Sequence, residues 1–442
     1  MESKLLFFLL VLVAILIPLQ TTQNLLFNKN IQLSEIAFLI LFISWFIQLI
    51  RKKIPLIRTP LDISILLFLV AGLLSLINSS DLQKSVIEFA GILSLALLYF
   101  LVVNIVKNKK QLVLIIKIWL LVSGLVALIG FGGFIYSLIW QKSCWAATYY
   151  PRYSSIVPFP RINATLRDMS MLASYLHIGV LLALGMFLAH HEVCPSQGRV
   201  ESNAKHQWLF PLALFIAGIV FFTGSRNMFG LAVSIYLLAF CVKKYGEMIR
   251  SVLLVMTVSL GIVVIAVTVW CIYPAKIYFE AGSKKIISEI NLAPSSYFVL
   301  FEAAVKMVKD QPLTGVGLDM YNKKLVDYMD WEKNQETYAA HGMEYYKTGH
   351  DPHSAYLGYA AETGLLGLGA MVAMFFCLLR RLARSVKLSN DKFWQILLWS
   401  FLAIFAGFLV NGFYSDIIKT RHFWFVAGLG IAAVNIMKKE KT

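Results

Sequence analysis

Residues 112–137 read LVLIIKIWLLVSGLVALIGFGGFIYS, an apolar stretch whose single charged residue is Lys117. A helix needs about 20 apolar residues to cross the hydrocarbon core of a bilayer, so this stretch is long enough. Similar apolar runs lie near 5–20, 32–50, 61–78, 87–106, 169–189, 208–223, 227–242, 251–273, 354–379, 394–412 and 422–437. The sequence therefore predicts an all-α polytopic membrane protein with about 12 transmembrane helices.

The composition supports this class of protein. Hydrophobic residues make up 59% of the 442 residues, and charged residues only 14%. Ordinary soluble domains are about 45–50% apolar and about 25% charged, so a soluble globular or disordered chain is excluded. The 5 cysteines are scattered and form no CxxC pair, so neither a disulfide framework nor a metal site is expected.

The basic residues cluster in short loops between the runs. Clusters of Lys and Arg lie at 51–58, 107–110, 243–250, 380–387 and 438–441. If the chain has twelve spans, all of these clusters fall on one side, which the positive-inside rule assigns to the cytoplasm. Both termini are then cytoplasmic. The net charge of +16 is explained mostly by this topology, together with attraction to anionic membrane lipid, and a nucleic-acid partner is not expected.

This topology leaves two substantial loops on the outer face, 141–168 and the much longer 274–353. We expect residues 1–273 to hold nine spans with short cytoplasmic loops, and residues 354–442 to hold three more and a cytoplasmic tail. Binding and catalytic residues are often found on loops held by a rigid scaffold. The chemistry is therefore expected on the outer loops and the helix ends beneath them.

The tenth apolar run begins with an unusual polar sequence. Residues 351–369 read DPHSAYLGYAAETGLLGLG, in which His353-Ser354 is followed after nine residues by Gly364 and Gly367. We expect the helix to start with Asp351 as its cap and with Pro352 in its first turn. A neutral imidazole at a helix start can accept a proton from a hydroxyl, because the helix dipole there disfavours protonation of the ring. The alternative role for His353 is a polar anchor at the membrane interface.

Two further stretches accompany it. Residues 310–317 read DQPLTGVG, which includes Pro312, Gly315 and Gly317, and residues 223–226 read TGSR between two apolar runs. In this order the three stretches resemble the O-antigen ligase and polymerase superfamily of bacterial membrane glycosyltransferases. The corresponding family patterns are H-[N/S/Q]-x9-G-x-x-[G/T/Y], D-x-P-L-x-G-V-G and T-x-S-R.

The resemblance implies a metal-independent transferase without a cofactor, on the outer face of a bacterial inner membrane. Its donor would be a glycan on undecaprenyl diphosphate, and its acceptor a hydroxyl of lipid A-core. A polymerase would instead use a second lipid-linked glycan as acceptor. A protein O-oligosaccharyltransferase and a lipid-linked-glycan transporter are further alternatives. Transport is less favoured because ionisable residues in the runs, such as Lys117 and Glu88, are interpreted as lying near span ends.

The resemblance also implies roles for individual residues. His353 would be the catalytic base, and Arg226 would bind the diphosphate, which a planar guanidinium can hold in a bidentate manner. Arg161 and Arg167 are candidate second contacts, and each arginine could instead be an interfacial anchor. Ser354, Gly364, Gly367, Pro312, Gly315 and Gly317 are expected to be structural.

One departure concerns an arginine that many members carry ahead of the Pro-Leu element. Here residues 295–297 read SSY, so Lys284, Lys285 or an arginine of the first outer loop would have to replace it. The linker 318–352 is rich in aromatic and polar residues, which would suit either sugar stacking or a lid.

Overall fold

The computed structural model describes residues 2–20, 32–51, 56–149, 160–193, 206–241, 279–281, 284–286, 295–330 and 352–440. This part of the chain is mostly helical. Its α-helices are α1 (Glu2–Leu16), α2 (Leu33–Ile50), α3 (Asp62–Ser75), α4 (Leu82–Ile105), α5 (Lys109–Trp140), α6 (Met169–Val193), α8 (Leu209–Phe222), α9 (Met228–Cys241), α11 (Ser295–Asp310), α12 (Tyr321–Tyr328), α15 (Ala355–Leu388), α16 (Lys392–Asn411) and α17 (Arg421–Lys439). A short 3-10 turn, η2 (Leu76–Asn78), follows α3.

The strands are very short. β1 (Ala147–Thr148) pairs antiparallel with β2 (Arg161–Ile162), and β3 (Phe279–Ala281) pairs antiparallel with β4 (Lys284–Ile286). The first pair packs against α5, so both ends of loop 141–168 lie on the same helix. No strand was expected here from the sequence.

Helices cover eleven of the twelve apolar runs, and the remaining run, 251–273, lies outside the described residues. Among the described residues, the helices that are long and apolar enough to cross a membrane are six: α2, α4, α5, α6, α15 and α16. Four shorter apolar helices, α1, α3, α8 and α9, accompany them. The mostly helical, multi-span architecture is thus confirmed, whereas the count of twelve spans stays a prediction.

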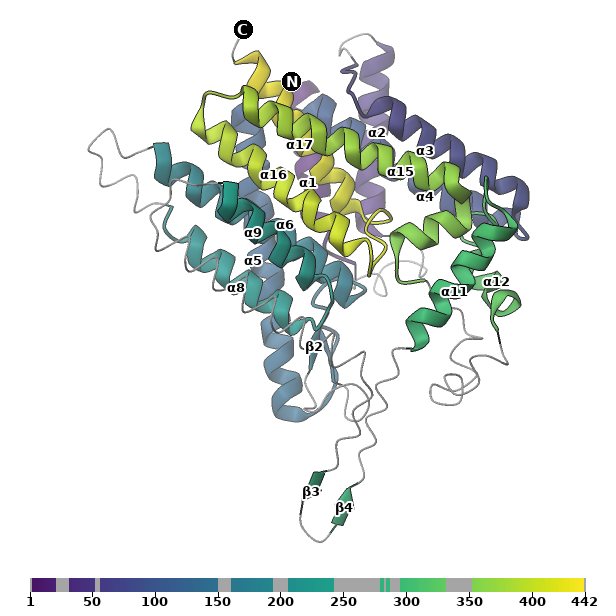
Figure 1. Cartoon of the computed structure of the whole chain (residues 1–442). Coiled ribbons are helices and arrows are strands. Elements are labelled where there is room, and N and C mark those ends of the chain that lie inside the picture. Colours follow the sequence, from purple (N-terminus) through teal and green to yellow (C-terminus); the bar gives the residue numbers. More distant parts are fainter. Residues whose placement is uncertain are drawn as a thin grey trace.

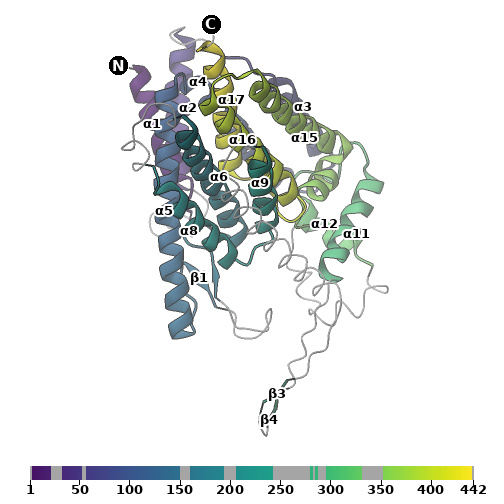
Figure 2. The same ribbon diagram turned by 60° about the vertical axis from the view of Figure 1, so that its left-hand side comes forward.

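The last helix occupies the centre of the bundle. Nearly every residue of α17 is buried, and its chief neighbour is α4. Phe425 of α17 stacks on Trp119 of α5 at 5.5 Å, and Trp119 in turn lies 4.9 Å from the ring of Tyr175. A helix that is apolar on most sides is enclosed either by neighbouring helices or by lipid, and neighbouring helices enclose α17. Figures 1 and 2 show α17 surrounded in this way, with both chain termini at the same end of the bundle.

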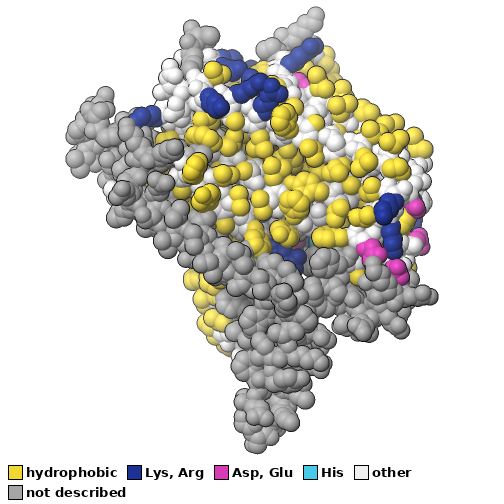
Figure 3. All heavy atoms as spheres, viewed as in Figure 1, with side chains coloured by type: hydrophobic (Ala, Val, Ile, Leu, Met, Phe, Trp, Pro, Cys, Tyr) yellow, Lys and Arg dark blue, Asp and Glu magenta, His cyan; other side chains and the backbone are white. Residues whose placement is uncertain are grey.

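The outside of the bundle is apolar over a broad area. Large side chains such as Ile63 (73% exposed), Leu121 (63%) and Leu66 (59%) face outward. Figure 3 shows a wide area of hydrophobic side chains on one face of the molecule, with Lys and Arg gathered mainly at its upper end. Apolar surface on this scale marks contact with lipid. The basic end is the one that holds both termini, as expected if that end is cytoplasmic, and the orientation itself stays a prediction.

The segment expected to be a long outer loop contains two helices, α11 and α12. They pack against each other and against α15 around a second small core, which includes Leu300, Met307 and Leu325. Both helices are amphipathic, so they bury one face while the other stays polar. Residues 331–351 of the same segment lie outside the described residues.

Candidate functional site

Helix α15 is broken near its start. Gly364 has φ of 68° and ψ of −170°, which interrupts the helical hydrogen bonds around it. Segment 312–317 replaces them with four backbone hydrogen bonds. Before the break, the N–H groups of Val316 and Gly317 donate to the carbonyls of Ala361 (2.8 Å) and Glu362 (3.1 Å). After the break, the N–H groups of Leu365 and Leu366 donate to the carbonyls of Pro312 (2.8 Å) and Leu313 (3.4 Å). The DQPLTGVG stretch and the His353-to-Gly367 stretch therefore form one structure.

Two glycines make this close approach possible. A Cβ atom on Gly364 would overlap the backbone of Leu313 and Thr314, and one on Gly315 would overlap the backbone of Glu362. Both glycines also have positive φ, a conformation that costs other residues roughly 1–2 kcal/mol. Both glycines are expected from the sequence to be structural, and the structure shows that Gly364 marks the break in α15.

The side chain of Asn78 holds the same segment from the opposite direction. Its amide donates to the Gly315 carbonyl and to the Thr314 hydroxyl, both at 2.8 Å. Lys324 of α12 donates to the carbonyls of Asn78 (3.3 Å) and Val316 (3.1 Å). The connection between α3 and α4, segment 312–317 and the first part of α15 are thereby fixed together.

A cavity of about 160 Å³ lies beside this structure. Its walls come from the start of α6, the start of α15 and the connection between α16 and α17. The polar residues that line it include His353, Glu362, Asp416, Lys419, Tyr414 and Asp168. We refer to it as the outer cavity, since it lies at the end of the bundle away from the termini.

His353 lies in the wall of the outer cavity, just outside α15. The helix cap is Ser354, whose hydroxyl accepts from the Leu357 N–H at 3.4 Å. The expectation that Asp351 caps the helix with Pro352 in its first turn is wrong, because Ser354 is itself a favourable cap. The Gly412 carbonyl fixes this start, since it accepts from the Ala355 N–H at 2.8 Å.

The backbone of His353 is also unusual, with φ of 48°. For a residue other than glycine, a left-handed conformation costs about 1–3 kcal/mol and persists only where the surroundings impose it. Such strain is often found at functional sites. The position of the imidazole in the cavity wall is therefore set by the fold around it rather than by helical geometry.

Lys419 lies at the centre of a charged cluster in the outer cavity. Its Nζ is 3.0 Å from Glu88 of α4, 3.6 Å from Asp416 and 3.7 Å from Glu362 of α15. Burial lowers the pKa of Lys419, but the three nearby carboxylates outweigh burial and hold its pKa above the ordinary lysine value. Lys419 is therefore a permanent cation surrounded by acids.

Neither Glu362 nor Lys419 was singled out from the sequence. Glu362 lies inside the apolar run 354–379, so the interpretation that the spans carry no deep ionisable residue is wrong. Its side chain is only 8% exposed. An acidic residue within a span is by default a candidate functional residue, and this signal could have identified Glu362.

Arg226 and Arg161 meet at the TGSR turn. The Arg226 guanidinium carbon lies 6.0 Å from the ring centre of Tyr414, which lines the outer cavity. Arg161 donates through Nε to the Thr223 carbonyl (3.1 Å) and through Nη2 to the Gly224 carbonyl (2.8 Å). Arg161 therefore holds the turn that carries Arg226.

The same turn is tied to the cavity wall. Asn227 donates to the Ser170 carbonyl at 2.7 Å and accepts from the Ser415 hydroxyl at 2.9 Å. Ser170 and Ser415 both line the outer cavity. Arg167 is exposed and is not among the described residues that line the cavity.

The structure thus brings His353, Ser354 and, through Tyr414, Arg226 to one cavity, with Gly364 and segment 312–317 beside it. The side chains of Lys284, Lys285 and residues 295–297 lie outside the described part, so the replacement for the missing arginine stays open. Among the described residues, no group of three or more His, Cys, Asp and Glu side chains is arranged to hold a metal ion.

Comparison with known proteins gives one family. Residues 211–372 match the family model described as O-antigen ligase, while no curated protein matches the chain. The matched range runs from α8 into α15 and includes the TGSR turn, segment 312–317, His353 and the break at Gly364. Together with the apolar helices, it supports a multi-pass inner-membrane glycosyltransferase of the ligase or polymerase type. The resemblance expected from the motifs is confirmed over residues 211–372, which are similar to the O-antigen ligase family.

Proposed function

We propose that the protein transfers a glycan from undecaprenyl diphosphate to a hydroxyl of lipid A-core, on the outer face of the inner membrane. The observation that carries this proposal is the outer cavity, in whose wall His353 lies together with acidic residues and with Tyr414, the neighbour of Arg226. The family match supports lipid-linked glycan as the substrate class.

The charges of the site suggest how the two substrates are divided. Carboxylates such as Asp168 and Asp416 can accept hydrogen bonds from sugar hydroxyls, which suits the acceptor. Arg226 lies beside Tyr414, and its guanidinium can hold the donor diphosphate. Arg161 then acts as a positioning residue, because it holds the turn on which Arg226 lies.

In the proposed reaction, the acceptor hydroxyl oxygen attacks the anomeric carbon of the donor sugar. The His353 imidazole takes the hydroxyl proton, and the bond between the anomeric carbon and the diphosphate oxygen breaks. Undecaprenyl diphosphate leaves with the bonding electrons, and Arg226 stabilises the negative charge that develops on it. No step of this proposal uses a metal ion or a cofactor.

The break in α15 bears on the transporter alternative. Transporters use broken helices to present free backbone groups to an ion or substrate. Here backbone groups on both sides of Gly364 are hydrogen-bonded to segment 312–317. The break therefore favours a fixed scaffold for a reaction site rather than a transport path.

The proposal is tested by deleting the gene and complementing it with wild type, His353→Asn or the control His206→Ala. Asparagine tolerates the left-handed conformation of position 353 but cannot act as the base. His206 is a matched control because it stacks on His190 at 3.7 Å, outside the outer cavity. Glycans on lipid A-core and on the polyprenyl carrier are then resolved by gel.

With His353→Asn we expect long polymer to remain on the carrier and lipid A-core to stay bare, with transfer reduced about 100-fold or more. The control should behave like wild type. Core capped with single repeats would mean a polymerase instead. Full transfer by His353→Asn would exclude the proposed base, and normal glycans in the deletion strain would exclude both reactions.

A further inference from the structure

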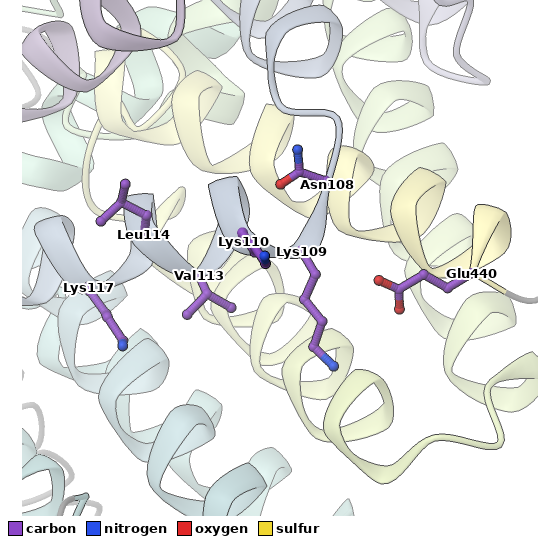
Figure 4. Close-up of a pocket in the computed structure, with 7 residues that line it drawn as sticks. All are labelled: Asn108, Lys109, Lys110, Val113, Leu114, Lys117 and Glu440. Carbon is purple, nitrogen blue, oxygen red and sulfur yellow. The ribbon is translucent and has the colours of Figure 1, made fainter. Parts of the chain in front are cut away.

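A second, larger hollow lies at the opposite end of the bundle. Its volume is about 740 Å³, and the start of α5 and the chain end after α17 form it. The residues that line it are Asn108, Lys109, Lys110, Val113, Leu114, Lys117 and Glu440 (Figure 4). We call it the basic hollow. Because Glu440 lines it, the basic hollow lies at the end that holds the termini (Figure 1).

The hollow is basic, and its cations are not matched by the described residues that surround them. It contains three lysines and one glutamate, and the carboxylate of Glu440 accepts a hydrogen bond from the Trp394 indole at 2.8 Å. Across the described ranges, Lys109, Lys110 and Lys117 form no ion pair. The Nζ of Lys109 instead lies 4.0 Å from the centre of the Phe393 ring.

The lysines lie at two depths along α5. Lys110 and Lys117 are both exposed and are seven residues apart, which places them on one face about 10 Å apart along the helix. Lys117 thus lies about two turns inside a helix that is long and apolar enough to span the membrane. An ammonium group at that depth is stabilised by an anion that reaches below the water interface.

An apolar stripe continues from the hollow along the same face of α5. Leu114 lines the hollow and is 46% exposed, and beyond it lie Leu121 (63%), Leu125 (51%) and Leu128 (56%). These positions follow one another at helical spacing of three, four or seven residues. A ligand that fits both parts has an anionic head for the lysines and hydrocarbon chains for the leucines.

We propose that the basic hollow binds an anionic phospholipid of the adjacent leaflet. The phosphate lies between Lys110 and Lys117, and the acyl chains follow the leucine stripe of α5. A free phosphate would use the lysines but not the stripe, whereas a zwitterionic lipid would bring its own cation close to them. This inference does not depend on the reaction proposed for the outer cavity.

The test uses the purified full chain in nanodiscs made of equal parts phosphatidylglycerol and phosphatidylcholine. Lipids that remain bound are counted by native mass spectrometry for wild type, Lys110→Gln/Lys117→Gln and the charge-retaining Lys110→Arg/Lys117→Arg. The matched control is Arg384→Gln/Lys387→Gln, which removes two exposed cations of α15 that do not line the hollow. Size-exclusion profiles establish that each variant is folded.

Wild type, the arginine variant and the control should retain phosphatidylglycerol in preference to phosphatidylcholine. The glutamine variant should lose this preference by on the order of 25-fold, since each lysine near an anionic lipid contributes about fivefold. An unchanged preference in the glutamine variant would overturn the proposal, as would an equal loss in the control. Displacement of the lipid by inorganic phosphate would show an anion site without a lipid and would also overturn it.

Discussion

The outer cavity and the basic hollow differ in how the protein holds their charges. In the outer cavity, Lys419 lies within 3.7 Å of three carboxylates that come from α4, α15 and the connection before α17. In the basic hollow, three lysines come from the first turns of one helix and have room around them. In the outer cavity the charged side chains are held in place by one another. In the basic hollow the lysines are available to bind an anionic ligand. Substitutions should therefore have large effects at the outer cavity and small effects at the hollow.

The largest effect is expected for Gly364→Ala. The new Cβ would push segment 312–317 away from α15, with loss of hydrogen bonds on both sides of the break. Positive φ and the lost hydrogen bonds together should cost about 3 kcal/mol or more. Gly369→Ala is the matched control, because its Cβ would meet open space on the same helix. Thermal unfolding in detergent should show a much lower melting temperature for Gly364→Ala alone, and equal melting temperatures would contradict the role given to the break.

The second largest loss of stability is expected for Lys419→Gln, because it leaves three carboxylates without their cation. Removing one partner of a buried ion pair costs about 3–5 kcal/mol, and the 25% exposure of Lys419 places this variant near the lower bound. The double variant Lys419→Gln/Glu362→Gln should recover part of the loss, because it also removes one of the acids. Melting temperatures of the two variants provide the measurement, and a double variant no more stable than the single one would argue against the cluster.

The contribution of Lys419 to the stability of the protein has a defined pH dependence. Because the pKa of Lys419 is raised in the folded protein, its stabilising contribution is complete below the unfolded value of about 10.4 and is lost only as pH rises through the folded value. Wild type should therefore keep this contribution as pH rises to about 9. Lys419→Gln should become more stable relative to wild type as pH falls, since protonation relieves the repulsion between its carboxylates.

A smaller effect on activity is expected for Arg226→Lys at the rim of the outer cavity. Lysine keeps the charge but loses the bidentate fork, so transfer should fall about tenfold without loss of folded protein. Arg167→Lys, on an exposed arginine outside the cavity lining, is the comparison. Transfer rates at several donor concentrations would test this difference, and equal rates for the two variants would remove Arg226 from the proposed diphosphate site.

The smallest effect is expected for Lys109→Gln in the basic hollow. This change removes the contact of the partly buried ammonium with the Phe393 ring, which contributes on the order of 1 kcal/mol. Transfer activity should change by less than about twofold, as activity assays in detergent can show. A loss of activity comparable to that of Arg226→Lys would mean that the two ends of the molecule are coupled, and the comparison drawn above would fail.

The sequence predicts the helices well and the site only in part, for one physical reason. Apolar runs such as 112–137 are local signals, and the structure has helices where eleven of the runs were expected. The break at Gly364 depends on contact with segment 312–317, which helical spacing alone does not reveal. The cap at Ser354 likewise depends on the Gly412 carbonyl, some 58 residues further along the chain.

Two further features of the structure can be recognised from the sequence. Glu362 is an acid in an apolar run, and such residues are rarely without a function. In α11, the residues buried in the small core, such as Val299, Ala303 and Met307, recur every four positions, as in an amphipathic helix. Lys419 is different, because nothing in its local sequence indicates that Glu88 and Glu362 lie beside it.

The break in α15 also has a consequence for biosynthesis. During insertion into the bilayer, unpaired backbone groups near Gly364 would each cost several kcal/mol in hydrocarbon. Segment 312–317 precedes α15 in the chain. The ribosome therefore makes this segment before it makes the helix whose backbone groups the segment hydrogen-bonds. The order of synthesis thus allows the broken helix to be completed as it emerges. A circular permutant that placed 295–330 after α17 would reverse this order, and the broken helix would have to enter the membrane before its partner existed.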